Sequence, residues 1–374
     1  MRSALAVVIG IACAACESNG ATTAPGSPTL SVQGRLERSL AVGVQLTVGG
    51  AAVPGAVFTA TPAANVLVFA GDSLRLLADG PLTISARGVS GRDSVHATAN
   101  VNVAVPPTIV FDRLVSGNRD IWSVQLDGAA LTRLTSDPGD DRQPTARGGR
   151  VYFISLRTGT PQLFKVSLAG GADARVTSDN VADGYPALAP NGSMVVFAAG
   201  SGFPKITLAD TAGANETRFA AADGGAGSAI EARPAWSPTG DRIAYTTTRD
   251  GSAGIYVGQT AGATGSATQL VSGANGYGSA EPAWSFDGNT IAFASDRDGP
   301  TDLYAITVAN GAVARLTTVG QAGEPAWLPD GRVVFTQYVT GGTFALRWVD
   351  PADTAHVHAI PTGPGSAEHA AATP

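Results

Sequence analysis

Six side chains at one position of an internal repeat are the best candidates for chemistry in this sequence. Each precedes a repeated proline or its C-terminal counterpart: Gln143, Tyr185, Arg233, Glu281, Glu324 and Glu368. The segments that lead into these positions add more carboxylates: Asp137, Asp140, Asp141, Asp179, Asp183, Asp223 and Glu231. Such a set would bind a cationic or polar segment of a partner by charge complementarity. The alternative is that each glutamate bonds a neighbouring backbone group or arginine and fixes the spacing between repeats.

The sequence offers little for catalysis or for a bound metal. It contains no Gly-x-Ser-x-Gly motif, and its four histidines are scattered. His356 and His358 could begin a zinc site, but no third ligand is evident. The segment 296–302 is rich in oxygen ligands, yet the same residues also make an ordinary hairpin turn. We therefore expect no enzyme activity, no cofactor and no metal.

A repeat of forty to fifty residues must position these side chains. Pro-Ala-Trp followed by a turn with glycine occurs at 234–240, 282–288 and 325–331, and weaker copies begin at Pro144 and Pro186. The five prolines are 42, 48, 48 and 43 residues apart. Each copy continues with short apolar runs separated by polar turns, which predicts four antiparallel strands. This period and pattern predict an all-β propeller.

The second and third strands of each repeat carry aromatic side chains at a fixed spacing. They lie 11 residues apart in Phe111/Trp122, Phe153/Phe164, Tyr245/Tyr256 and Phe293/Tyr304, and leucine replaces the second member in Phe197/Leu208 and Phe335/Leu346. We expect all six hairpins to share one length. Two further sets have structural interpretations. Trp236, Trp284 and Trp327 should pack between blades, and Arg133, Arg175, Arg218 and Arg315 should blunt the outer edges.

The C-terminal residues supply a strand that the first repeat lacks. The propeller region, 108–374, begins with the second-strand run 109–111 and has no proline motif before it. The segment 366–372 aligns with 279–285, which places Glu368 in the position of Glu281. We therefore predict six blades, with the C-terminal strand closing the ring and leaving no unpaired inner edge.

The repeat grammar resembles the WD40-like beta-propeller (PD40) repeats of the TolB family. The likeness rests on Pro-Ala-Trp-Ser, the glycine turn, Ile-Ala-Phe at 291–293 and Arg-Asp-Gly at 297–299. It implies a six-bladed propeller in the periplasm that docks a protein, as TolB docks the peptidoglycan-associated lipoprotein. A role in the Tol–Pal system does not follow, because the N-terminal domain differs from that of TolB.

The N-terminal part predicts an anchor and a spacer. Residues 1–16 read as a signal peptide whose end resembles the lipobox of bacterial lipoproteins, with Cys16 as the lipidated residue and Cys13 as the alternative. The other interpretation is a plain signal peptide that is cleaved nearby. A polar linker follows at 17–28. Residues 29–105 alternate apolar and polar side chains, which predicts a β-sandwich. This stretch resembles bacterial immunoglobulin-like (Ig-like) repeats, which implies a spacer or adhesive module.

Composition limits the partners. The formal net charge of −6 argues against nucleic acid and against an anionic membrane surface, since both need basic patches. We expect a monomeric lipoprotein of the bacterial cell envelope, in the periplasm or at the outer membrane, with the lipid anchor as its only membrane contact. Its propeller would dock an envelope protein or peptide. The alternative is a propeller that binds or cleaves carbohydrate.

Overall fold

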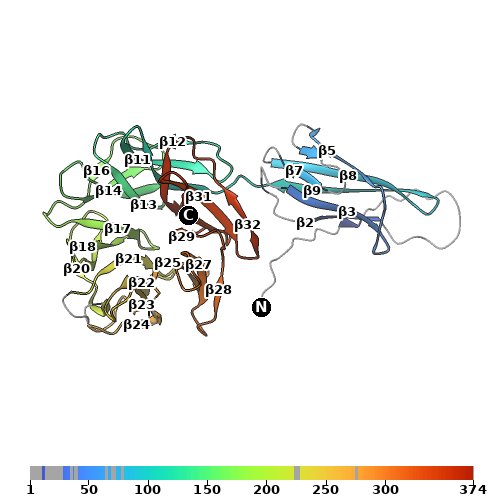
Figure 1. Cartoon of the computed structure of the whole chain (residues 1–374). Coiled ribbons are helices and arrows are strands. Elements are labelled where there is room, and N and C mark those ends of the chain that lie inside the picture. The colour runs from blue at the N-terminus through green and yellow to red at the C-terminus, as the bar shows by residue number, and fades with distance from the viewer. Residues whose placement is uncertain are drawn as a thin grey trace. The chain divides into compact units, whose positions relative to one another are not determined.

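The computed structural model describes residues 11–12, 28–33, 37, 41–63, 66–68, 73–76, 80–222, 228–273 and 277–373. They form strands and turns, together with a short 3₁₀ helix (η2, Ala220–Ala222), which confirms the all-β prediction. The chain divides into two compact units, Met1–Pro106 and Pro107–Pro374 (Figure 1). Cys13, Cys16 and the predicted linker up to residue 27 lie outside the described residues.

The first unit contains two antiparallel sheets. One has the order β1-β2-β3-β7-β6, with β4 beside β3, and the other has the order β5-β8-β9. Buried side chains from both sheets, among them Leu46 of β3 and Ile84 of β8, form one apolar core. The strands are β1 Ile11–Ala12, β2 Pro28–Gln33, β3 Ala41–Val48, β4 Ala51–Ala52, β5 Val57–Thr61, β6 Val66–Val68, β7 Ser73–Leu76, β8 Gly80–Ser90 and β9 Asp93–Val103.

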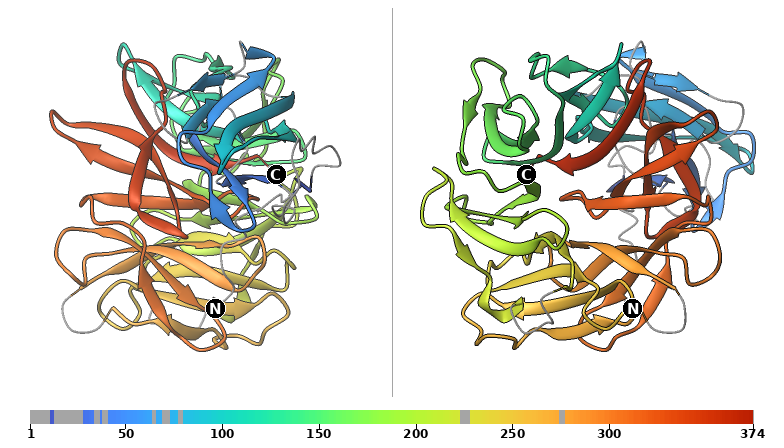
Figure 2. Two further views of the ribbon diagram at one scale, coloured as in Figure 1. Left: turned by 90° about the vertical axis from the view of Figure 1, so that its right-hand side faces the viewer. Right: turned by 60° about the vertical axis from the view of Figure 1, so that its left-hand side comes forward.

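The described part of the second unit forms six four-stranded antiparallel sheets around a central axis (Figure 2). The first sheet consists of β33 Ser366–Ala372, β10 Thr108–Val115, β11 Asn118–Gln125 and β12 Thr132–Arg133. The second consists of β13 Asp141–Arg147, β14 Arg150–Ser155, β15 Gln162–Ser167 and β16 Ala174–Arg175. The third consists of β17 Asp183–Leu188, β18 Met194–Ala199, β19 Lys205–Asp210 and β20 Thr217–Arg218.

The remaining three sheets repeat this order of strands. The fourth consists of β21 Glu231–Trp236, β22 Arg242–Thr247, β23 Gly254–Gln259 and β24 Thr268–Val271. The fifth consists of β25 Ser279–Trp284, β26 Thr290–Ser295, β27 Asp302–Thr307 and β28 Val313–Arg315. The sixth consists of β29 Ala322–Trp327, β30 Val333–Val339, β31 Thr343–Asp350 and β32 Asp353–Ala359.

The innermost strand of each sheet contacts the innermost strand of the next. We call β33, β13, β17, β21, β25 and β29 the ring strands. The C-terminal strand β33 pairs with β10 and contacts both β13 and β29. The predicted pairing of the C-terminal segment with the first strand of the second unit is therefore present in the structure.

Buried aromatic side chains build the core between the sheets. The same second-strand position holds Phe111, Phe153, Phe197, Tyr245, Phe293 and Phe335, and all six are 0 % exposed. Each contributes on the order of 2 kcal/mol through burial. Apolar clusters then join neighbouring sheets, as Val110 of the first sheet does with Phe153 of the second. The repeat thus places one aromatic side chain in every sheet.

Four of the six predicted hairpins share the register that the spacing of 11 requires. Phe111 pairs with Trp122, Phe153 with Phe164, Tyr245 with Tyr256 and Phe293 with Tyr304. The prediction is wrong for the other two, because Phe197 faces Thr207 and Phe335 faces Arg347. The paired positions are 10 residues apart in the third sheet (207−197) and 12 apart in the sixth (347−335), so one hairpin is one residue shorter and the other one residue longer. Both changes shift the register by one residue.

Arginines from the hairpin loops stabilise three of these aromatic pairs. The Arg297 guanidinium lies 5.0 Å from the ring centres of both Phe293 and Tyr304. Arg157 and Arg249 occupy the same position over the pairs of the second and fourth sheets. These cation–π contacts fix the loops on one face of the unit.

The arginines of the outer strands lie at the sheet edge, and they also form ion pairs or hydrogen bonds with side chains of the neighbouring strand. Arg133 pairs with Asp120 at 2.6 Å and Arg315 with Asp302 at 2.7 Å. Arg175 donates to the side chain of Gln162 at 3.0 Å. The outer strands β12, β16 and β28 are therefore each tied to the third strand of their sheet.

The antiparallel order defines two faces. We call the end where the ring strands begin the hairpin face, because it also carries the loops between second and third strands. The opposite end is the turn face, where the glycine turns follow the ring strands. At one such turn Gly288 has φ +71° and donates to the Ser285 carbonyl at 3.0 Å. Glycine adopts this conformation without steric cost.

Candidate functional site

The ring strands share a β-bulge at the position picked out by the repeat. The residue there has a left-handed backbone in every ring strand, with φ between 52° and 62°: Gln143, Tyr185, Arg233, Glu281, Glu324 and His369. The ladder to the neighbouring strand shifts at the same point, as between Ala280 and Ala283. A bulge changes the direction in which the side chain points. A positive φ that recurs at residues other than glycine indicates that the surrounding structure maintains the bulge in every ring strand.

The predicted position of Glu368 is wrong by one residue. In β33 Glu368 pairs with Asp112 before the bulge, just as Ala280 pairs with Ala294 in β25. The residue equivalent to Glu281 is therefore His369, and Ala370 takes the place of the proline. The sequence alignment failed because β33 lacks the proline that marks the bulge in the other five ring strands.

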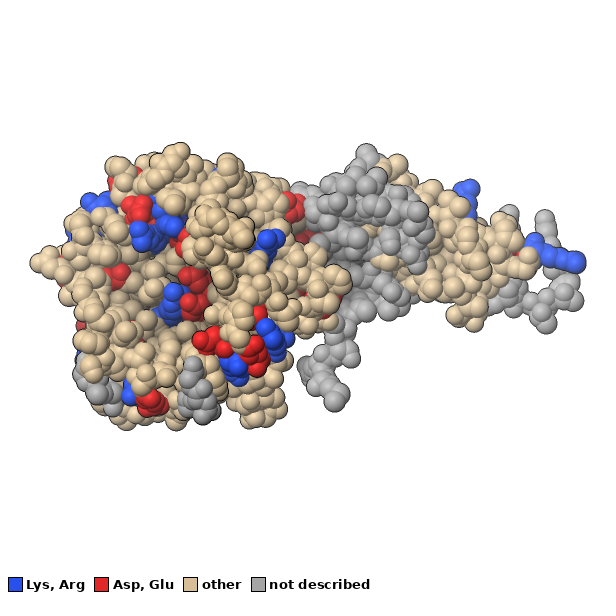
Figure 3. Space-filling model, viewed as in Figure 1, with Lys and Arg blue, Asp and Glu red and all other residues tan. Residues whose placement is uncertain are grey.

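The bulge residues come together at the centre of the unit. Gln143, Tyr185, Arg233, Glu281, Glu324 and His369 line one cavity of about 140 Å³, with the adjacent prolines and Ala370. Acidic and basic side chains lie next to one another in the hollow at the middle of this unit (Figure 3). The structure thus brings together five of the six predicted site residues.

Ion pairs link Arg233 and His369 to these carboxylates. Arg233 lies 3.1 Å from Glu281 and 3.4 Å from Glu324, and its guanidinium stacks over the Tyr185 ring at 4.3 Å. His369 Nε2 lies 2.8 Å from Glu324. Burial by itself would raise the pKa of Glu324, but His369 and Arg233 lower it to about 2.

A second group of ion pairs continues into the first sheet. His369 Nδ1 lies 2.7 Å from Asp112, and Arg119 lies 2.5 Å from Asp112 and 2.6 Å from Glu368. Burial by itself would lower the pKa of His369, but Asp112 and Glu324 raise it to about 10. His369 is therefore protonated at neutral pH and acts as a cation.

Side chains at the bulge also accept backbone N–H groups from the next ring strand. Gln143 Oε1 accepts from Tyr185 at 2.8 Å, Glu281 Oε2 from Glu324 at 2.5 Å, and Glu324 Oε2 from His369 at 3.1 Å. Glu281 and Glu324 therefore bond neighbouring backbone and arginine, as the alternative interpretation predicted. Their charges stabilise the spacing of the sheets, and they are already paired within the central cavity.

Several of the carboxylates in the segments that lead into the bulge positions are buried, and we call this set of carboxylates the rim. Asp141 pairs with Arg157 at 3.0 Å, and Glu231 pairs with Lys205 at 3.3 Å. Asp183 has no cation partner among the described residues and accepts the Thr177 hydroxyl. Burial, with Asp179 and Glu216 nearby, raises the pKa of Asp183 to about 7. Asp137 and Asp140 are half-buried, Asp179 is exposed, and Asp223 lies outside the described residues. The rim is less acidic than the sequence suggested.

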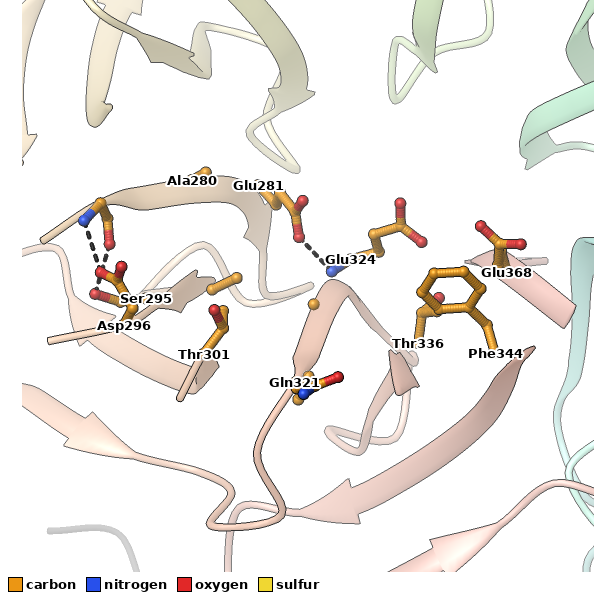
Figure 4. A pocket seen from close by; sticks show the side chains of 14 residues that line it. Ala280, Glu281, Ser295, Asp296, Thr301, Gln321, Glu324, Thr336, Phe344 and Glu368 are labelled. Carbon is orange, nitrogen blue, oxygen red and sulfur yellow. Dashed lines mark hydrogen bonds between the residues drawn. The ribbon is translucent and has the colours of Figure 1, made fainter. Parts of the chain in front are cut away.

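A larger cavity lies beside the central one on the hairpin face (Figure 4). Its volume is about 430 Å³, and residues of the fifth and sixth sheets and of β33 line it. Glu281, Glu324 and Glu368 reach it together with Asp296 and the ring of Phe344. Sequence reasoning missed Phe344 because the hairpin of the sixth sheet departs from the repeat.

Most of the exposed large apolar side chains in the described part of the second unit lie on loops or strand ends of the hairpin face. In the described part of the second unit seven large apolar residues are prominently exposed. Five belong to the hairpin face: Val181, Phe203, Ile230, Val319 and Tyr338, with exposures from 38 % to 54 %. The other two, Phe286 and Val313, lie at the turn face. These five side chains belong to different loops or strand ends, so the hairpin face exposes more large apolar side chains than the turn face does.

The tryptophans of the repeat pack between sheets near the turn face, as predicted. Trp236 donates to the Ala187 carbonyl and Trp327 to the Ala283 carbonyl, each at 3.1 Å. Both carbonyls belong to the ring strand that precedes that of the tryptophan. Trp284 is 7 % exposed and lies under the Arg242 guanidinium. These indoles fill space between blades.

His356 and His358, which are two residues apart in the sequence, have separate partners. His356 bonds Asp353 at 2.9 Å, and His358 stacks on Trp348 with ring centres 3.9 Å apart. Within the described ranges no three His, Cys, Asp or Glu side chains converge in a way that could hold a metal ion. Nor does the described part of the chain contain a helix with the length and apolar character to cross a bilayer.

Comparisons with known proteins support the fold. Residues 204–363 match a family model described as the TolB beta propeller domain. No curated protein matches the sequence. TolB from Acinetobacter baumannii has 18 % identity and a TM-score of 0.63, with 85 % of this chain and 83 % of that chain covered. A TolB candidate from Agrobacterium tumefaciens has 20 % identity and a TM-score of 0.55, with 68 % and 88 % covered.

The same architecture also occurs in an enzyme. Hydrazine synthase of Kuenenia stuttgartiensis matches with 15 % identity and a TM-score of 0.57, covering 71 % of this chain and 46 % of that chain. At such identities the likeness concerns the fold, and function depends on the site. The second unit of this protein is thus a TolB-like β-propeller.

Proposed function

We propose that this protein is a non-catalytic envelope lipoprotein whose propeller docks a protein or peptide through the hairpin face. In this proposal the six sheets are blades of one wheel closed by β33. The first unit is an Ig-like spacer, and a lipid on Cys16 anchors the chain to a membrane. The match of 204–363 to a TolB propeller model supports an envelope role.

One observation carries the docking proposal. Of the seven prominently exposed large apolar side chains in the described part of the propeller, five lie on the hairpin face. Ion pairs among the bulge residues, and between Arg119 and Glu368 next to them, compensate most of the charge at its centre. In protein interfaces a few side chains, with aromatic ones prominent among them, carry most of the binding energy. The six bulge residues would position the centre of this interface rather than provide its affinity.

Capture of partners by the full chain tests this surface. Phe203→Asp and Tyr338→Asp change the hairpin face, and Phe286→Asp and Val313→Asp are matched controls at the turn face. With crosslinking in a bacterial envelope extract, we expect the first pair to lose the captured protein at least about tenfold and the controls to retain it. Melting temperatures should agree within about 2 °C. Equal capture by all four variants would remove the hairpin face from consideration.

The anchor has its own test. Labelling of cells with a palmitate analogue should mark the wild-type protein and leave Cys16→Ala unmarked. Label on Cys16→Ala that disappears in Cys13→Ala would move the anchor to Cys13. Absence of label from the wild-type protein would overturn the lipid anchor.

A further inference from the structure

The 430 Å³ cavity beside the ring has a lining of unusual chemistry. Four carboxylates line it, from Glu281, Glu324, Glu368 and Asp296, and its lining includes no Lys, Arg or His. The rest of the wall is largely apolar or neutral, with Phe344, Ala280 and Ala322 among its residues. Its volume falls within the range of roughly 300–1,000 Å³ typical of ligand sites.

The cations that pair with three of these carboxylates do not line the cavity. Arg233 forms an ion pair with Glu281, and His369 forms one with Glu324. Arg119 pairs with Oε1 of Glu368 at 2.6 Å. Glu368 Oε2 has no hydrogen bond from the described residues. Asp296 accepts the Gly278 backbone N–H at 2.7 Å and has no ion pair within the described chain. The cavity therefore presents carboxylate oxygens with unused acceptor capacity.

An aromatic wall stands next to Glu368. Phe344 lies beside Glu368 in the cavity (Figure 4). Its ring packs edge-on against Tyr338, with centres 5.4 Å apart and planes at 72°. Tyr338 is 40 % exposed and belongs to the proposed docking surface. A ligand side chain would meet apolar surface and carboxylate together.

We infer that this cavity binds the side chain of one lysine or arginine presented by the docked protein. The inference rests on the proposed docking function and specifies the chemistry of the partner. The alkyl part of the side chain packs against Phe344, and the charged end lies beside Glu368. Lysine and arginine alone combine a long apolar stem with a permanent positive charge.

Peptide selection on the intact protein tests the inference. A random peptide display library is selected on the full chain, and the tightest peptide is resynthesised with each basic residue replaced in turn by norleucine. We expect a lysine or arginine at one fixed position, and we expect norleucine there to weaken binding by about tenfold or more. Binding should also weaken with rising salt. The norleucine peptides leave the protein unchanged, so folding of a variant cannot obscure the result.

Two protein variants locate the contact. Glu368→Gln and Phe344→Ala should each weaken the basic peptide several-fold and leave its norleucine analogue unaffected. Asp353→Asn, an exposed carboxylate change on β32 of the sixth sheet, is the control and should change neither.

The outcomes separate the two proposals. In one outcome the selected peptides lose binding to Tyr338→Asp and yet tolerate norleucine at every basic position. That result would overturn the cavity inference and would still support docking at the hairpin face. Selected peptides indifferent to both Phe203→Asp and Tyr338→Asp would count against the docking proposal itself. A selection that enriches no peptide would overturn the cavity inference.

Discussion

His369 Nδ1 lies 2.7 Å from Asp112 Oδ2, so one ion pair joins the C-terminal strand to the first strand of the propeller unit. Asp112 is fully buried, and its second oxygen bonds Arg119. His369 also holds Glu324 of the sixth sheet. One imidazolium thus connects the sheet at the beginning of the ring with the sheet at its end.

Replacement of His369 by alanine should destabilise the protein by about 3 kcal/mol. The reason is that Asp112 and Glu324 would each lose a buried cation partner. Chemical denaturation measures the change. His356→Ala, whose partner Asp353 is exposed, is the matched control and should cost less than about 0.5 kcal/mol. Similar losses from both variants would contradict a special role for His369.

The same pair gives the stability a defined pH dependence. The pKa of His369 is raised from 6.5 to about 10. Between these values the folded protein keeps a proton that the unfolded chain releases, so stability falls as pH rises through this window. The pKa of Glu324 is lowered from 4.5 to about 2, so its contribution is present above 4.5 and is lost as pH falls through 2.

Unfolding of the wild type and His369→Ala from pH 6 to pH 10 measures the histidine contribution. The gap in stability between the two proteins should be largest near pH 6 and should shrink toward pH 10. A gap that stays constant over this range would show that the ion pair does not set the stability.

Charge reversal at Glu281 should destabilise the protein more than neutralisation does. Glu281 accepts the Glu324 backbone N–H and pairs with Arg233. Glu281→Lys removes the acceptor and places two cations together, which should cost about 3 kcal/mol. Glu281→Gln keeps an acceptor oxygen, as Gln143 does for Tyr185, and should cost about 1 kcal/mol. Thermal melting ranks the two variants, and equal losses would show that the backbone contact is unimportant.

Asp183→Asn should stabilise the protein at neutral and alkaline pH. Asp183 is buried without a cation, and burial raises its pKa from 3.8 to about 7. Stability contributed by the protonated carboxyl is full below pH 3.8 and is lost as pH rises through 7. Relative to the wild type, the free energy of unfolding of Asp183→Asn should therefore be larger by on the order of 2 kcal/mol above pH 7 and unchanged near pH 4.

Asp141 provides the matched control, because it begins β13 as Asp183 begins β17. It pairs with Arg157 at 3.0 Å. Burial raises the pKa of Asp141 too, but Arg157 and hydrogen bonds to Asp141 oppose that shift. Asp141→Asn should destabilise the protein, since Arg157 would lose a buried charge partner. A stabilising effect at both positions would mean that the ion pair contributes nothing.

Much of the fold could be predicted from the repeat, because its signals are local. Proline and glycine fix turns, and an aromatic side chain at the second-strand position is buried in every sheet. The hairpins of the third and sixth sheets could not be predicted, since a one-residue change in loop or strand length leaves the apolar pattern nearly the same.

The candidate site was predictable in position and not in chemistry. Gln143, Tyr185, Arg233, Glu281 and Glu324 line one cavity, as their common place in the repeat indicated. Sequence spacing could not reveal that Glu281 reaches the backbone of Glu324, because the two belong to different sheets.

The sequence by itself determined the all-β class, the repeat and five of the six residues that meet at the ring, because strand periodicity and turn chemistry act over a few residues. The tertiary structure alone decided that His369, rather than Glu368, occupies the sixth bulge, and that most central charges are paired. The physical reason is that bulge register and ion pairing depend on strands brought together from opposite ends of the unit, as with Asp112 and His369.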